Sequence, residues 1–261
     1  MQHQIASALN RLGAFCGMRD IPALTHDALF LKYGIKRADV MVLFGGSILA
    51  GGDLLANAMR NGIAKTYAIV GGEGHTTQAL RDRVHALYPD FITDGLPEAK
   101  VFEGYLARRY SLKPDLLECA STNCGNNITN LLALLKDRNI RFDTIILSQD
   151  ASMQRRMDAG MRKHSPETKI INFATYAAEV VVHNGALTFS ESISGMWTLD
   201  RYASLLLGEI PRLTDDENGY GPNGKSFIAH VDVPDEIRSA FAFLARLNPE
   251  LIRDANPKYA G

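Results

Sequence analysis

The sequence is poor in cysteine and has no block of charge of one sign. Its 261 residues include three cysteines, Cys16, Cys119 and Cys124, and no two of them form a CxxC pair. An odd, sparse set of this kind does not build a disulfide framework and fits a reducing compartment. The formal net charge is −1, with acidic and basic side chains interspersed. No electrostatic footprint for nucleic acid or an anionic membrane is therefore present.

Long hydrophobic runs and a secretory leader are also missing. The longest apolar runs, such as VMVLF at 40–44, fall far short of the ~20 residues that a membrane helix needs. The first twenty residues lack a basic segment followed by an apolar one. We therefore expect a cytoplasmic protein with no membrane and no nucleic-acid partner. The apolar content of 46% is that of an ordinary globular protein.

Short apolar runs that alternate with helical patterns predict the fold. Strand-like runs occupy 39–46, 66–72, 143–150 and 169–175, with a weaker one at 115–121. Helical patterns occupy 52–61, 76–87, 97–110, 126–137 and 152–163, and the first 35 residues are helical with a break at Pro22. Strands that are apolar on both faces belong to a parallel sheet covered by helices on both sides. We expect an α/β, Rossmann-like fold with a mostly parallel sheet.

The alternation stops near residue 175. An amphipathic helix at 196–210, a glycine- and aspartate-rich loop at 214–225, a strand-like run at 227–233 and a helix at 234–247 follow. We therefore expect a Rossmann-like domain at 1–175 and a small, mainly helical C-terminal lobe at 176–261, with the N-terminal helices available to pack on the lobe.

Polar side chains gather where four of the predicted strands end. In an open parallel sheet, ligands bind beyond the carboxyl ends of the strands, and paired glycines there let a ligand approach exposed backbone N–H groups. We predict one crevice for a small-molecule ligand. Its expected ligand-binding residues are Gly45, Gly46, Ser47, Gly71, Gly72, His75, Thr77, Glu98, Ser121, Thr122, Asn123, Asn127, Gln149, Asp150 and Arg155.

Several of these residues also have a purely structural interpretation. Glu98 opens a helix, where a carboxylate is stabilised by the helix dipole, or it accepts a hydrogen bond from a ligand hydroxyl or ammonium group. His75 is either a loop residue that is hydrogen-bonded to the backbone or a residue that contacts the ligand. Because adjacent helical residues point about 100° apart, at most one of Arg155 and Arg156 is directed at the crevice. For catalysis, Glu98 and Asp150 are the leading candidate bases, followed by His75.

The remaining chemical motifs are weaker. Cys124 lies near a predicted helix start, which lowers a thiol pKa, but no histidine is local, and Cys119 is expected to be a buried strand residue. The stretch at 219–226 matches G-x-x-x-x-G-K-[ST] but does not join a strand to a helix. The stretch GGEGHTT at 71–77 lacks the third glycine of a dinucleotide fingerprint. The sequence shows no metal-binding cluster.

Five segments together resemble the YdcF-type branch of the bacterial SanA/YdcF-like family, a domain of unknown function. They are VMVLFGG at 40–46, GGEGHTT at 71–77, PEA at 97–99, STNCGNN at 121–127 and QDASMQRR at 149–156, and the stretch from 199 to 234 is also typical of that branch. The resemblance covers nearly the whole chain. It implies a Rossmann-like domain with a C-terminal lobe and binding of S-adenosylmethionine. The family often has Glu where this chain has Asn126.

The leading hypothesis is binding of S-adenosylmethionine or a similar nucleoside-like ligand in the crevice, with the reaction unassigned. One alternative is a hydrolase or transferase that acts on a phosphorylated or glycan-type substrate, because arginines and a histidine lie near the expected site. Another is a non-catalytic sensor whose lobe closes over a ligand. The oligomeric state does not follow from the sequence.

Overall fold

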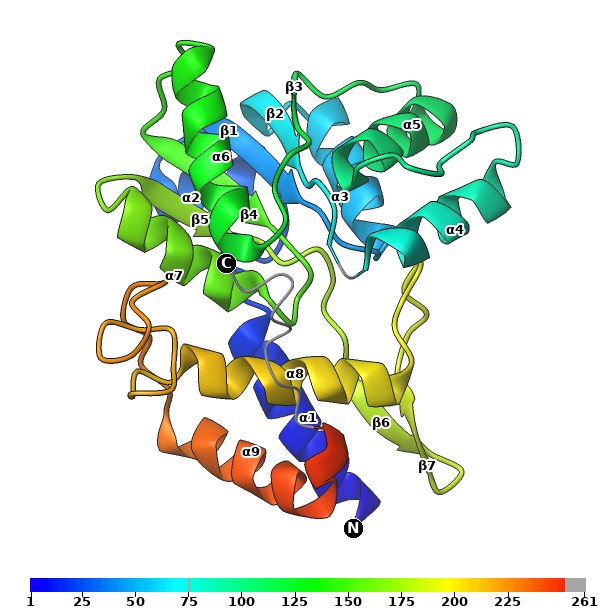
Figure 1. Cartoon of the computed structure of the whole chain (residues 1–261), viewed down its shortest axis with the longest axis vertical. Coiled ribbons are helices and arrows are strands. Elements are labelled where there is room, and N and C mark those ends of the chain that lie inside the picture. Colours follow the sequence, from blue (N-terminus) through cyan, green and yellow to red (C-terminus); the bar gives the residue numbers. More distant parts are fainter. Residues whose placement is uncertain (75, 252–261) are drawn as a thin grey trace.

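A five-stranded parallel sheet forms the centre of the upper part of the molecule (Figure 1). The computed structural model describes residues 1–74 and 76–251. The strand order is β3-β2-β1-β4-β5. The strands are β1 (Ala38–Phe44), β2 (Ala64–Val70), β3 (Leu116–Glu118), β4 (Thr144–Ser148) and β5 (Lys169–Asn172). The predicted α/β fold is confirmed, including the weak strand near residue 117.

Helices cover both faces of the sheet. One face carries α2 (His26–Tyr33), α3 (Ala50–Arg60), α4 (Thr77–Leu87) and α5 (Glu98–Tyr110), and the other carries α6 (Cys124–Asp137) and α7 (Gln154–His164). Side chains alternate along β1, so Met41 and Leu43 pack with the first group while Val40 and Val42 pack with the second. Both faces of the central strand are buried, as its continuous apolar run predicts.

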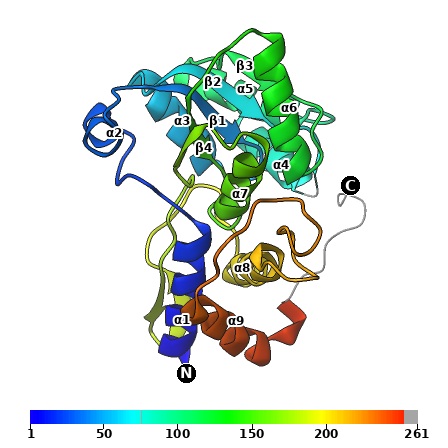
Figure 2. The ribbon, with the colours of Figure 1, turned by 90° about the vertical axis from the view of Figure 1, so that its left-hand side faces the viewer.

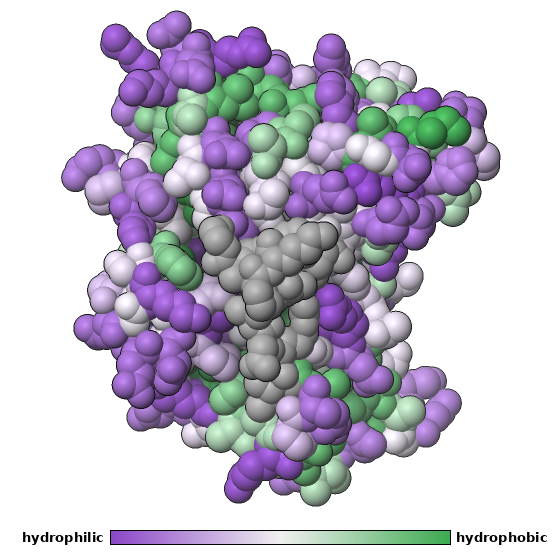
Figure 3. Space-filling model, viewed as in Figure 1, coloured by the Kyte–Doolittle hydropathy of each residue, from purple (hydrophilic) through white to green (hydrophobic). Residues whose placement is uncertain are grey.

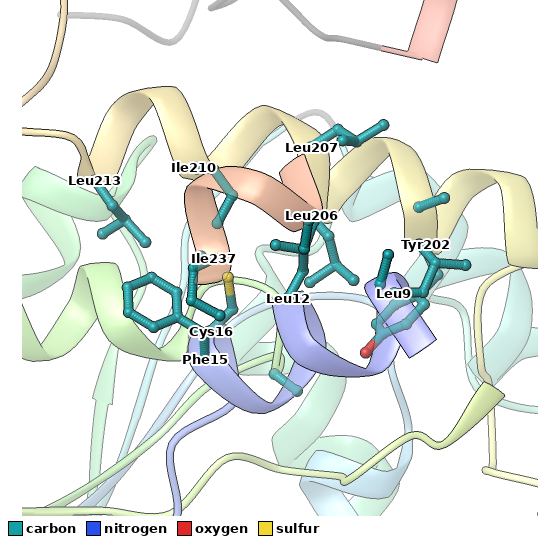
Figure 4. Packing of buried hydrophobic residues seen from close by; sticks show 14 of the residues in the cluster. Leu9, Leu12, Phe15, Cys16, Tyr202, Leu206, Leu207, Ile210, Leu213 and Ile237 are labelled. Atoms are coloured by element: carbon teal, nitrogen blue, oxygen red, sulfur yellow. The ribbon is translucent and has the colours of Figure 1, made fainter. Parts of the chain in front are cut away.

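The lobe lies below the sheet in Figure 1, at the edge where the strands end. It contains a β-hairpin, two long helices, a short 3-10 helix and the N-terminal helix. Their bounds are α1 (Gln2–Cys16), β6 (Val180–His183), β7 (Ala186–Phe189), α8 (Leu199–Leu213), α9 (Asp235–Leu247) and Pro249–Leu251. Although α1 begins the chain, its apolar face packs against α8 and α9 (Figure 4), whereas α2 packs on the sheet.

The segment 227–233 is not the strand that its sequence indicates. Its backbone has no strand partner and instead binds two other elements: Ile228 N donates to Tyr220 O, and Ala229 N donates to Ala159 O in α7. Figure 2 shows the 214–233 segment curving between α7 and α8. Ile228, Val231 and Val233 of this segment are buried in the lobe core rather than in a sheet, which is why their pattern looked like that of a strand.

The hairpin β6–β7 was not expected from the sequence. Asn184 and Gly185 form its turn, with φ of 51° and 79°. Two positive φ values in succession are those of a type I′ turn, for which Asn-Gly is the preferred dipeptide. The dipeptide between VVVH and ALTF is therefore a local signal that predicts this hairpin.

The face seen in Figure 3 is mostly hydrophilic, with apolar atoms gathered over the lobe at the bottom of the view. Among the helices that the structure describes, none combines the length and the hydropathy needed to cross a membrane.

Candidate functional site

The ends of four strands form one continuous row of close contacts. A Cβ on Gly45, after β1, would lie 3.1 Å from Cα of Gly71, after β2. A Cβ on Gly72 would lie 2.3 Å from the backbone oxygen of Ser121, after β3, and one on Gly46 would lie 3.6 Å from Oε1 of Gln149, after β4. The structure therefore brings together glycines and polar residues that the sequence predicted to share one edge.

Glu98 lies at the centre of this row. Its backbone N–H donates to Gly72 O at 2.8 Å, which anchors the first turn of α5 to the end of β2. Its Oε1 accepts a hydrogen bond from the Thr77 hydroxyl at 2.8 Å, and its Oε2 lies 2.1 Å from the position that a Gly45 Cβ would occupy. Glycine is needed at position 45 because the carboxyl group fills the space of a side chain.

Burial changes the acidity of Glu98. The side chain is only 8% exposed. Burial raises its pKa to about 7, although hydrogen bonds from Thr77 and Thr76 and the charge of Arg81 oppose the change. Desolvation disfavours the charged carboxylate more than these donors stabilise it. Near neutral pH this residue can both accept and donate a proton, which is the property of a general acid–base group.

The loop after β3 is shaped by Glu118, a residue that the sequence analysis did not select. Its buried carboxylate accepts hydrogen bonds from the backbone N–H groups of Ala120 and Ser121 and from the side chain of Asn130. The fixed loop lets the Ser121 hydroxyl accept from Gly72 N at 3.2 Å. In the sequence, the signal for this role is a carboxylate at the last position of a strand, directly before a polar loop.

The first turn of α6 holds the next group of predicted residues. Asn123 is the N-cap, and its Oδ1 accepts from Asn126 N at 2.9 Å. The Oδ1 of Asn126 in turn accepts from Asn123 Nδ2 and from the hydroxyl of Thr122. Asn127 is half-buried, and its backbone N–H donates to Asn123 O. The helix-capping interpretation is thus realised here.

Gln149 and Asp150 connect the sheet to the lobe. Asp150 accepts hydrogen bonds from Ser152, from the Tyr176 hydroxyl at 2.6 Å and from Trp197 Nε1 at 2.9 Å. Gln149 Oε1 accepts from Asp150 N. The Asp150 carboxylate therefore serves as a clamp in this structure, and its predicted role as a base would require these donors to be released.

The crevice between β1 and β4, where the strand order reverses, is occupied by the chain itself. Ser194 O accepts from Ala50 N at the start of α3, and Gly195 packs on Leu49. Arg83 donates to the backbone oxygen of Ser47 at 2.7 Å and lies over the Trp197 ring. This crevice is the usual ligand position of doubly wound sheets, and here residues 194–197 lie against it.

The two adjacent arginines both contact the lobe. Arg155, the predicted ligand contact, is hydrogen-bonded through Nε to Phe15 O and lies 4.0 Å from the Phe15 ring centroid. Arg156 forms a bidentate ion pair with Glu209 at 2.7 and 2.9 Å. In this arrangement the Arg155 guanidinium is directed at α1 and not at the carboxyl ends of β1 to β3.

Three buried hydroxyls near the same edge have no hydrogen-bond partner among the residues that the structure describes, and they belong to Ser47, Ser148 and Thr175. Ser47 was a predicted ligand contact, but it is fully buried. His75, predicted as both a ligand contact and a base, lies outside the described residues.

Two cysteine predictions need correction. Cys119 is exposed rather than buried, because it follows the last residue of the short strand β3. Cys124 is half-exposed at the start of α6, but burial raises its thiol pKa, while the Arg156 charge opposes that change. Desolvation therefore keeps the thiol protonated near neutral pH, and the lowered pKa expected at a helix start is not found.

The 219–226 loop is built around carboxylates, not around a phosphate position. Asp215 Oδ1 accepts from Asn223 N, and Asp216 Oδ1 accepts from Gly219 N. A phosphate loop directs such N–H groups at an anion, so the structure supports the rejection of that motif. In the described part of the chain, no three His, Cys, Asp or Glu side chains are grouped in a way that could hold a metal ion.

No family model matches the sequence. A structure search finds the crystal structure of E. coli tRNA N6-threonylcarbamoyladenosine dehydratase, TcdA, at 16% identity with a TM-score of 0.34, covering 85% of this chain and 95% of that one. A second structure, titled TcdA (CsdL), matches at 12% identity with a TM-score of 0.33, covering 87% and 93%. Scores this low carry no argument about the fold or the function.

Proposed function

We propose that this protein binds a small polar ligand at the carboxyl ends of β1, β2 and β3, with the Glu98 carboxyl as the central recognition group. The observation that carries the proposal is a buried carboxyl group set among glycines that have no room for a side chain. A Cβ would lie 2.1 Å from Glu98 Oε2 if added at Gly45, and 2.3 Å from Ser121 O if added at Gly72. Glycine permits such close approach of the backbone, and a buried carboxyl group with a raised pKa is a candidate functional-site residue.

S-adenosylmethionine is the first ligand to test, because the resemblance to the YdcF-type branch implies it. The residues present suit its polar groups. Glu98 can accept from an ammonium or ribose hydroxyl, and Ser121 and Asn123 offer hydroxyl and amide groups nearby along the same edge. The resemblance itself stays a proposal, and no methyl transfer is derived from it.

Calorimetry with S-adenosylmethionine tests this proposal. We expect binding heat for the unmodified protein and at least a tenfold weaker affinity for Glu98→Gln, because an ammonium ion loses its charged acceptor (about 1.5–3 kcal/mol for a charge-assisted bond). Glu167→Gln, at an exposed carboxylate, is the matched control. The absence of both heat and a thermal shift at millimolar ligand would rule out this ligand.

A second candidate function is a hydrolase or transferase acting on a phosphorylated or glycan-type substrate. The pKa of about 7 for Glu98 favours it, since an acid–base catalyst works best near the operating pH. Turnover of phosphoesters or nucleotide sugars that disappears in Glu98→Gln would support this function. Turnover that survives the substitution would contradict it.

A further inference from the structure

A separate cavity lies at the α6 N-terminus, and Glu98 is not among its lining residues. Its volume is about 310 Å³, and it is enclosed by the first turn of α6, the exposed face of α7 and residues 220–228 of the lobe. We call it the α6 cavity. A volume at the small end of the range for ligand sites suits one ring and one substituent group rather than a dinucleotide.

The α6 cavity has a basic side. Arg156, Lys163 and His164 line it from α7, spaced so that they share one face of that helix. Glu209 neutralises Arg156 through their ion pair, whereas Lys163 is bonded to the uncharged backbone oxygen of Ser226. None of the described residues that line the cavity is acidic. The electrostatic potential in the cavity is therefore positive, and the α6 N-terminus adds to it.

The α6 cavity also has aromatic and apolar lining residues, which adjoin the basic ones, since Arg156 lies 6.0 Å from the Tyr220 ring centroid. Tyr220 and Phe227 form an edge-to-face pair with ring centroids 5.3 Å apart, and Ile128 and Ile228 line the wall behind them. Phe227 is 50% exposed, an unusual position for a phenylalanine that is packed by one neighbouring ring. A flat ring entering the cavity would cover this exposed aromatic surface.

We infer that the α6 cavity binds a small molecule in which a flat ring carries one anionic group, either a phosphate or a carboxylate. The ring would contact Phe227 and Tyr220, while the anionic group would lie near Lys163 and the first turn of α6. The inference does not rest on the proposed function: Asn123 lies at both sites, but none of the residues that hold Glu98 line this cavity.

Calorimetry with AMP and with indole-3-acetate tests the inference and distinguishes the two anionic groups. We expect at least one of them to bind. AMP alone indicates a phosphate-bearing ring, and indole-3-acetate alone indicates a carboxylate-bearing ring. Adenosine and inorganic phosphate, which each lack one half of the recognised chemistry, should bind at least about tenfold more weakly than AMP.

Three substitutions locate the binding site. Phe227→Ala should weaken binding at least tenfold through lost stacking, and Lys163→Ala about tenfold through a lost charged donor. Asn126→Glu, which places a carboxylate in the cavity lining, should also weaken it about tenfold. Phe30→Ala is the matched control, since Phe30 is 57% exposed on α2 and does not line the cavity. Thermal melts of each variant confirm folding.

Two results would overturn the inference. One is that neither AMP nor indole-3-acetate binds at millimolar concentration. The other is binding that is lost in Glu98→Gln but kept in Phe227→Ala, which would place the ligand at the strand ends instead. Failure of S-adenosylmethionine to bind would leave the AMP result unaffected, so the two proposals fail separately.

Discussion

Glu98 is a buried acid that should make the stability of the protein depend on pH. In the unfolded chain its pKa is near 4.5, and burial raises it to about 7 in the folded protein. Between these values the unfolded state releases the proton while the folded state keeps it, so the free energy of unfolding falls as pH rises, and it levels off above pH 7. The full difference is about 3 kcal/mol.

We therefore predict that the free energy of unfolding of Glu98→Gln rises relative to that of the unmodified protein, by about 2.5 kcal/mol, as pH increases from 5 to 8. Urea unfolding at the two pH values measures this. Glu167→Gln, on an exposed side chain, should show no such trend. An unchanged difference between Glu98→Gln and the unmodified protein at both pH values would mean that Glu98 has an ordinary pKa.

Two glycines at the strand ends should differ strongly in how much alanine substitution destabilises the protein. A Cβ on Gly72 would lie 2.3 Å from Ser121 O and 2.8 Å from Cys119 O, both backbone atoms, whereas one on Gly46 would lie 3.6 Å from a flexible glutamine side chain. Gly72→Ala should lower the free energy of unfolding by about 1–3 kcal/mol. Gly46→Ala should lower it by much less than Gly72→Ala does. Denaturation midpoints of the two variants compare them directly, and equal midpoints would contradict the packing described at Gly72.

At the scale of a single element, the first turn of α6 contains Asn126, the position at which the chain differs from the YdcF-type branch that it resembles. Asn126 is the third residue after the N-cap Asn123, the position at which Glu completes a capping box and interacts favourably with the helix dipole. In this chain the Asn126 amide oxygen accepts from Asn123 and Thr122 instead. A Glu at position 126 would therefore have a helix-capping role that does not require catalysis.

Asn126→Glu should therefore raise the free energy of unfolding by about 0.5 kcal/mol, while Asn126→Lys should lower it by a similar amount. Thermal unfolding at low salt measures both, and the difference should shrink as salt is added because the charge–dipole interaction is screened. Equal stability of the two variants at low salt would show that the dipole is not the dominant effect.

At the scale of the whole molecule, Asp150 joins the lobe to the sheet. Trp197, on the lobe side, donates to its Oδ2, and Tyr176, after β5, donates to its Oδ1. The Arg156–Glu209 ion pair, with Glu209 only 5% exposed, makes a second connection. Both connections join residues that follow β4, Asp150 and Arg156, to residues beyond position 175.

We predict that Asp150→Ala lowers the free energy of unfolding by about 3 kcal/mol, because it leaves buried donors without an acceptor. The sequence has a single tryptophan, so its fluorescence reports on the surroundings of Trp197, which include Asp150 and Arg83. Its emission should shift to longer wavelength and be quenched more by acrylamide. Asp53→Asn, at a carboxylate that bonds tyrosines far from the lobe, should leave the emission unchanged.

The strands, the helices of the sheet and the polar edge could be predicted because their signals are local. Apolar runs that end at glycine define β1 and β2, and the asparagines before the leucines of α6 cap that helix. Backbone sterics and side-chain periodicity act within a few residues, so they can be read along the chain. The Asn-Gly turn of β6–β7 and the role of Glu118 were equally local.

Local sequence patterns are sufficient to define an α/β protein with polar groups collected at one edge of a parallel sheet. Which of these groups remain available depends on long-range packing. Asp150 meets Trp197, Arg155 meets Phe15, and α1 packs with α8 and α9. These contacts join residues 47 and 140 positions apart, and no local pattern encodes them. They follow from how the lobe buries its apolar surface against the ends of the strands.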